Sequence, residues 1–112
     1  MTMLNLTPHA ITVRSENGNV DTTFPPTGQV ARLVPRTADA GPADGFPVVF
    51  CFPGIVEGLP EYVMGTYLIV SSMVAQHPDI AITRPDVLAP NTGPTAIREN
   101  GQIVAVRGFQ RF

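Results

Sequence analysis

The sequence contains no lysine and a single cysteine, Cys51, and each scarcity excludes a kind of chemistry. One cysteine cannot form an intrachain disulfide, and with only His9 and His77 beside it the chain lacks any familiar zinc ligand set. The lack of lysine removes Schiff-base and P-loop lysine chemistry and leaves arginine as the only side-chain cation besides histidine. We therefore expect that the protein binds neither a metal nor a cofactor. The single cysteine also predicts a reducing compartment, the cytoplasm.

Charge is also scarce, because charged residues make up only 14% of the chain. The chain has seven arginines and nine acidic residues, so its net charge is −2. It therefore lacks the excess of positive charge that proteins use to bind the phosphate backbone of nucleic acids. We therefore expect no nucleic-acid partner. The longest apolar stretch, residues 67–75, is far too short to span a bilayer, and the N-terminus does not resemble a signal peptide. We therefore expect no membrane partner either.

The residues that are plentiful indicate a folded protein built from short elements. Hydrophobic residues make up 44% of the 112, enough for one core, and we expect a single domain over residues 1–112. Twelve prolines and ten glycines cannot lie inside long helices or central strands, so many turns are expected. No internal repeat or linker divides the chain.

Two Asn-Gly pairs predict hairpins, because both central residues of a type I′ turn need a positive φ. Asn17-Gly18 separates alternating runs over residues 4–13 and 20–24, and Asn100-Gly101 separates runs over 96–99 and 102–109. We therefore expect an antiparallel pair of strands near each end of the sequence.

Between these hairpins the pattern is less regular. Residues 29–34 predict a third strand, residues 36–45 a surface loop, and residues 55–62 a turn or crossover. The apolar run Phe46–Phe52 is short and bounded by prolines, which favours a buried strand with Cys51 in the core.

The most apolar region, residues 66–77, predicts a strand to about Val70 followed by the only helix, near residues 71–77. A short strand over residues 86–89 follows. The expected fold class is α+β and mainly β, with a small antiparallel sheet or half-open barrel of short strands and one short helix.

The first candidate for ligand binding is the alternating set Asn5, Thr7 and His9. On one strand, a period of two would place all three side chains on the same face, where they could line a pocket. The alternative is that Asn5 and Thr7 satisfy backbone groups of a loop while His9 closes a turn.

Ser71 and Ser72 form a second candidate, because hydroxyls at a strand-to-helix junction can receive a phosphate or carboxylate. The alternative is ordinary N-capping of the helix.

The third candidate is a loop that contains Asn91 and Thr92 and has Arg84 before it and Arg98 after it. Backbone donors in such a loop can hold an anion, and arginine grips phosphate with two hydrogen bonds. The alternative is an ordinary turn with a solvated arginine.

Four segments carry a resemblance to a known group: Asn5–His9 (NLTPH), Val56–Pro60, Gly65–Ser71 and Gly101–Arg107. In the same order along nearly the whole chain, they resemble small single-domain proteins of bacteriophages, prophages and actinobacteria that open with NLTPH. The resemblance implies a genomic setting and no particular mechanism. It also implies a host-cell cytoplasm as the location, and either a virion component or an accessory protein that counters host defence.

These observations favour a binding protein over an enzyme, because no spacing places a nucleophile or carboxylate beside a histidine. The first hypothesis is a homo-oligomer that binds and sequesters an anionic, nucleotide-like small molecule, which would counter host defence signalling. One alternative is a structural component of the virion or another protein-interaction component. A second alternative is a small hydrolase that uses His9.

Overall fold

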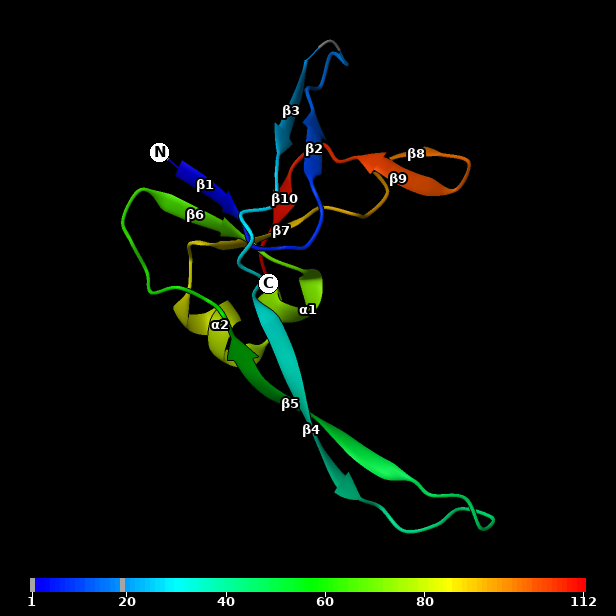
Figure 1. Ribbon diagram of the computed structural model, residues 1–112. Coiled ribbons are helices and arrows are strands. Elements are labelled where there is room, and N and C mark those ends of the chain that lie inside the picture. The colour runs from blue at the N-terminus through cyan, green and yellow to red at the C-terminus, as the bar shows by residue number, and fades with distance from the viewer. Residues whose placement is uncertain (1, 19) are drawn as a thin grey trace.

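The computed structural model describes residues 2–18 and 20–112, and it is mainly β with short helices, as the composition predicts (Figure 1). Its centre is a four-stranded sheet in the order β1-β6-β7-β10. The sheet consists of β1 (Thr2–Asn5), β6 (Thr66–Ile69), β7 (Val87–Pro90) and β10 (Phe109–Gln110).

Two of the three pairings in this sheet are parallel, so the expectation of an antiparallel sheet is wrong at its centre. β1 pairs with β6 and β6 pairs with β7 in parallel, and only β10 runs antiparallel to β7. Leu68, Ile69 and Val70 are buried, which is typical of a parallel strand that is covered on both faces. Parallel neighbours need a crossover connection, and the two helices lie in the one that joins β6 to β7.

The crossover contains α1 (Ser72–Ala75) and α2 (Pro78–Thr83). Ser71 caps α1 as predicted, since its hydroxyl accepts a hydrogen bond from the Val74 amide. The expectation of one helix is wrong, because Pro78 begins a second helix rather than only ending the first. Proline is favoured in a first helical turn, and the His77 ring caps α2 by accepting from the Asp79 amide.

Both predicted hairpins are present, namely β2 (Ile11–Arg14) with β3 (Asp21–Phe24) and β8 (Ile97–Glu99) with β9 (Gln102–Ala105). In the second hairpin, Asn100 and Gly101 have φ values of 53° and 80°, as a two-residue type I′ turn requires.

The run over residues 4–13 is not one strand. β1 ends at Asn5, residues 6–10 form an irregular turn, and β2 begins at Ile11. Asn5, Thr7 and His9 therefore do not alternate on a strand face. Pro8 interrupts the run, because it lacks an amide hydrogen and cannot donate to a ladder.

The middle of the chain forms a long two-stranded ribbon that projects from the body (Figure 1). It consists of β4 (Arg32–Asp39), β5 (Val49–Glu57) and their connection, and we call residues 32–57 the arm. Three predictions are wrong here: residues 36–39 are strand rather than loop, residues 46–52 are exposed, and Cys51 lies outside the core. A fourth prediction is also wrong, because β5 continues to Glu57, where a turn was expected.

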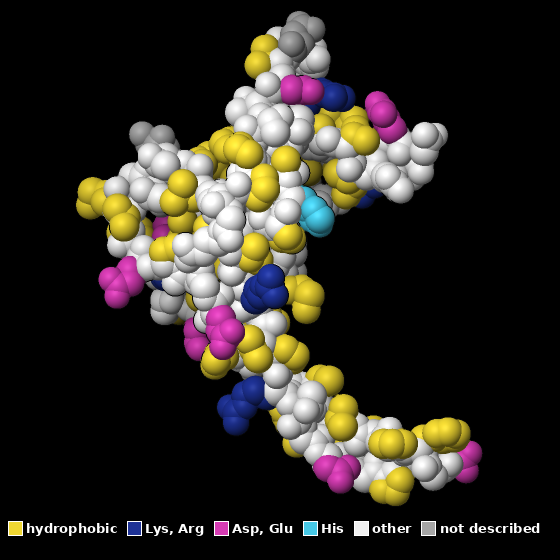
Figure 2. Space-filling view, in the orientation of Figure 1, with side chains coloured by type: hydrophobic (Ala, Val, Ile, Leu, Met, Phe, Trp, Pro, Cys, Tyr) yellow, Lys and Arg dark blue, Asp and Glu magenta, His cyan; other side chains and the backbone are white. Residues whose placement is uncertain are grey.

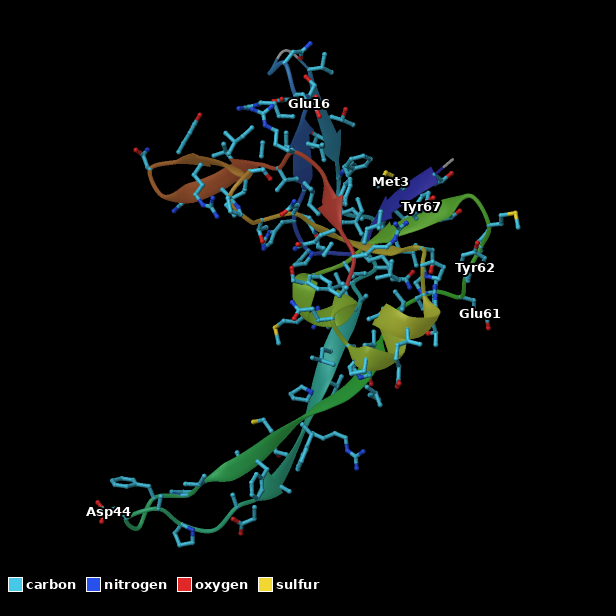
Figure 3. The ribbon with its side chains drawn as sticks, turned by 180° about the vertical axis from the view of Figure 1, so that it is seen from behind. Met3, Glu16, Asp44, Glu61, Tyr62 and Tyr67 are labelled. Carbon is cyan, nitrogen blue, oxygen red and sulfur yellow. The ribbon has the colours of Figure 1, made fainter. Side chains whose placement is uncertain are left out.

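The arm makes the molecule elongated. The radius of gyration is 16.8 Å, whereas a compact chain of this length has about 13 Å. Glu16 at the tip of the β2–β3 hairpin and Asp44 at the tip of the arm mark opposite ends (Figure 3). The base of the arm is anchored to the body, because Leu33 and Val56 pack against the core.

The core lies where the central sheet, α1 and the base of the arm meet. Its buried members come from distant parts of the chain: Leu6, Ala31, Leu68, Val70, Val74, Ala75, Val87 and Ala89. Within the described residues, neither helix is long and apolar enough to cross a membrane.

Candidate ligand-binding cleft

A cleft of about 390 Å³ opens beside the central sheet, and residues of β2, of β9 and of the segments that follow the central strands line it. This volume lies within the range of pockets that hold small organic ligands. The cleft is lined by five of the nine residues that the sequence singles out: Thr7, His9, Ser71, Ser72 and Thr92.

The parallel strands explain why these polar groups meet. Thr7 follows the end of β1 by two residues, Ser71 follows the end of β6 by two, and Thr92 follows the end of β7 by two. Parallel strands bring their carboxyl ends to the same edge of a sheet, which is where α/β sheets bind ligands. One edge therefore collects three hydroxyls that lie far apart in the sequence.

The opposite walls of the cleft are apolar, and sequence reasoning missed them. Ile11 of β2 and Ile103 and Val104 of β9 line this side. The two hairpins are joined beside it by a hydrogen bond of 2.9 Å from the Val106 amide to the Thr12 carbonyl. Ile11 lies far from Ile103 and Val104 in the sequence, and these residues line one cleft because the two hairpins pair.

Asn5 has a structural role, as the alternative interpretation predicted. Its side chain is 1% exposed and forms four hydrogen bonds within and around the turn. The amide nitrogen donates to the carbonyls of His9 and Phe24 at 2.7 and 2.9 Å. The side-chain oxygen accepts from the amide and hydroxyl of Thr7 at 2.9 and 2.7 Å. Asn5 thus fixes the turn that carries Thr7 and His9 into the cleft.

The polar side chains of the cleft differ in which hydrogen-bond donors and acceptors remain available to a ligand. The Thr7 hydroxyl hydrogen is used within the turn, so this group remains as an acceptor. Ser71 accepts from the Val74 amide and keeps its own hydrogen. No described residue forms a hydrogen bond with the side chains of His9, Ser72 or Thr92, which leaves these three free to contact a ligand.

Arg84 lies away from the cleft. Its guanidinium donates to both carboxylate oxygens of Asp86, at 3.0 and 2.9 Å, and to the Pro60 carbonyl at 2.7 Å. The hydrogen bond to Asp86 and the charge of that carboxylate raise the pKa of Arg84, against the opposing effect of burial. Through these hydrogen bonds Arg84 connects Pro60, which precedes β6, to Asp86, which precedes β7.

Arg98 and Asn91 shape the loop that carries Thr92. Arg98 donates to the Thr92 carbonyl at 3.0 Å and to the Gly93 carbonyl at 3.4 Å, and the Asn91 side chain accepts from the Gly93 amide. Neither side chain lines the cleft. Among the residues that do line it, His9 is the only one whose side chain can become positively charged.

Comparison with protein-family models, with curated proteins and with solved structures finds no match to the chain. The described residues also contain no group of three or more His, Cys, Asp or Glu side chains that could hold a metal ion.

Proposed function

We propose that the protein binds a small nucleotide-like molecule in this cleft and holds it without chemical change. The observation that supports the proposal is the meeting of three strand ends, each followed by a hydroxyl residue, opposite an apolar wall. Ligand pockets commonly combine mostly apolar walls with a few converging polar groups.

The two sides of the cleft suit the two parts of such a ligand. A planar base would pack against Ile11 and Val104, where burial of apolar surface contributes about 25 cal/mol per Å². The sugar and anionic group would face Ser72, Thr92 and His9, whose free polar atoms can hydrogen-bond to them. Because Arg84 and Arg98 are held by other partners, the anionic group would depend on His9 and the hydroxyls.

Sequestration fits this site better than turnover does. The hydrolase alternative needs His9 to activate a nucleophile or water, and no hydrogen bond in the described structure joins its ring to such a group. A protein that removes a signal nucleotide from solution would counter a host defence that depends on that signal. This role is the one we propose for a phage-encoded chain.

The first experiment is a thermal-shift screen with linear and cyclic nucleotides, followed by titration calorimetry of any hit. A ligand at about 100 times its Kd should raise the free energy of unfolding by about 2.7 kcal/mol. Mass spectrometry of the ligand released by denaturation should return it unchanged. Release of a cleaved product would instead identify an enzyme.

A matched pair of variants locates the site. Thr92→Phe places a ring in the cleft and should abolish binding, whereas Thr95→Phe changes the same residue type in the same loop outside the cleft. Equal binding by both variants would exclude the cleft, and no thermal shift with any nucleotide would refute the proposed ligand class.

A second candidate function is a structural or protein-interaction component of a virion, and the exposed apolar arm is the observation that favours it. Mass spectrometry of purified virions from a phage that encodes the chain tests it. Absence of the protein from these particles would refute a virion role.

A further inference from the structure

The arm exposes an unusual amount of apolar surface. Within residues 46–57 of the arm, six large hydrophobic side chains are between 38% and 69% exposed: Phe46, Val48, Val49, Phe50, Phe52 and Ile55. Yellow side chains follow the arm from its base to its tip in the space-filling view (Figure 2). An isolated two-stranded ribbon is marginally stable in water, and a long uncovered ribbon invites pairing with another chain.

An apolar groove runs from the body to the base of this arm. It consists of two hollows of about 300 and 380 Å³ that share Leu33 and Met73. The body half includes Leu6 and Pro8, and the arm half includes Phe52. We call it the Met73 groove, since Met73 is 69% exposed at the junction of its two halves. Methionine is over-represented on surfaces that bind apolar partners.

We propose that the occupant of the Met73 groove is the arm of a second copy of this chain, in a reciprocal two-fold dimer. A two-fold interface needs a surface that complements itself. One molecule carries both a projecting apolar arm and an apolar groove, and residues of the body and of the base of the arm line both hollows of that groove. The outer arm of one copy can therefore enter the groove of its partner, and the same contact repeats across the axis.

The area involved is sufficient for a stable dimer. The six exposed side chains of one arm present about 600 Å² of apolar surface, from their exposed fractions and the usual area of such side chains. Two reciprocal arms would bury about 1,200 Å² before the groove surfaces are counted. Stable interfaces bury about 1,200–2,000 Å² in total, and the two arms together with the grooves that receive them reach this range.

The charges of the two surfaces are also compatible. The outer part of the arm carries two exposed acidic residues, Asp39 and Asp44. Arg32, at the base of the arm, lines the hollow that contains Leu6, and it has no carboxylate partner among the described residues. An acidic arm that enters a groove bordered by an arginine favours the partner orientation that we propose.

Sedimentation velocity on the full chain, without any nucleotide, tests the dimer independently of the proposed ligand. The wild-type protein should sediment as a dimer, and Met73→Asp should shift it to monomer at the same concentration. Aspartate in the first turn of a helix is favourable, so this change leaves α1 intact, which circular dichroism can verify. Met64→Asp is the matched control, because Met64 is 85% exposed and lies outside both hollows. A monomeric wild-type protein, or a Met73→Asp variant that still dimerises, would overturn the proposal.

A mixing experiment tests whether the arm enters the groove rather than pairing with the other arm. Phe50→Asp damages the arm and leaves the groove, whereas Met73→Asp damages the groove and leaves the arm. Each variant alone should be monomeric, but a mixture retains one intact arm and one intact groove and should form a heterodimer. A mixture that stays monomeric at the highest concentration at which each variant alone is monomeric would overturn the reciprocal arrangement.

Discussion

Replacing Asn5 with alanine tests whether the NLTPH segment holds the fold together. The change removes four hydrogen bonds and leaves the Thr7 amide and the Phe24 carbonyl without their side-chain partner. A hydrogen bond contributes about 0.5–1.5 kcal/mol net, and a buried group left unpaired costs more. We therefore expect Asn5→Ala to lower the free energy of unfolding by about 3–4 kcal/mol, a large share of the roughly 5–15 kcal/mol of a typical domain.

The assay is urea-induced unfolding at 25 °C, followed by circular dichroism. Asn91→Ala is the matched control, since within the described part of the chain this half-buried asparagine has one side-chain hydrogen bond, accepted from the Gly93 amide, and its replacement should cost about 1 kcal/mol. Asn5→Asp gives a second check, because it keeps the shape but turns the donating nitrogen into an oxygen that faces two carbonyls. At neutral pH it should destabilise at least as much as Asn5→Ala. A loss below about 1 kcal/mol for Asn5→Ala would refute the structural role.

Two further changes test the arm and a surface ion pair. A Cβ added by Gly54→Ala would lie 1.5 Å from the Val34 carbonyl oxygen, so the variant should lose at least about 2 kcal/mol of stability and the protection of arm amides in hydrogen exchange. Retained protection would contradict the close approach of Gly54 to the Val34 carbonyl. The hydrogen bond from Arg14 lowers the pKa of Asp21 below its ordinary value of 3.8. The stabilisation by this pair is therefore present above pH 3.8 and is lost as the pH falls through the lower folded-state pKa. Asp21→Asn should be less stable than wild type at pH 7 and equally stable near pH 2 in urea titrations; a difference that persists near pH 2 would contradict this linkage.

Features that depend on a few neighbouring residues were predictable from the sequence. Asn100-Gly101 specifies its turn because both residues accept a positive φ, and no distant contact is needed. Ser71 likewise marks the start of α1, since the capping bond joins residues three apart. The mainly β class follows from the same local signals.

The direction of the central strands was not predictable in this way. The sequence of β6 reads as a buried strand in either orientation, and its parallel partners begin at Thr2 and Val87. The candidate site depended on that direction. Thr7, Ser71 and Thr92 were singled out for separate local reasons, yet they line one cleft only because the three strands run the same way.

The arm shows the limit of hydrophobicity as a guide to burial. An apolar run around Cys51 indicates a strand but does not say what covers it. In the structure this run lies on a ribbon with no layer packed over its outer part, so the same residues that predicted a core are exposed. Likewise, Arg84 and Arg98 could be recognised as arginines near a loop, but not as arginines already bound by other groups of the same chain.

The parallel pairing of β1 also determines when this protein can fold. Thr2 pairs with Thr66, and β10 closes the sheet edge only at Phe109 and Gln110. During synthesis, β1 therefore leaves the ribosome long before its neighbour exists, while the hairpin of β2 and β3 can already form. Pairings this distant in sequence are slow, because loop closure precedes any stabilising contact. The pairing of β1 must wait until β6 has been made, and the central sheet is completed only once Gln110 has left the ribosome.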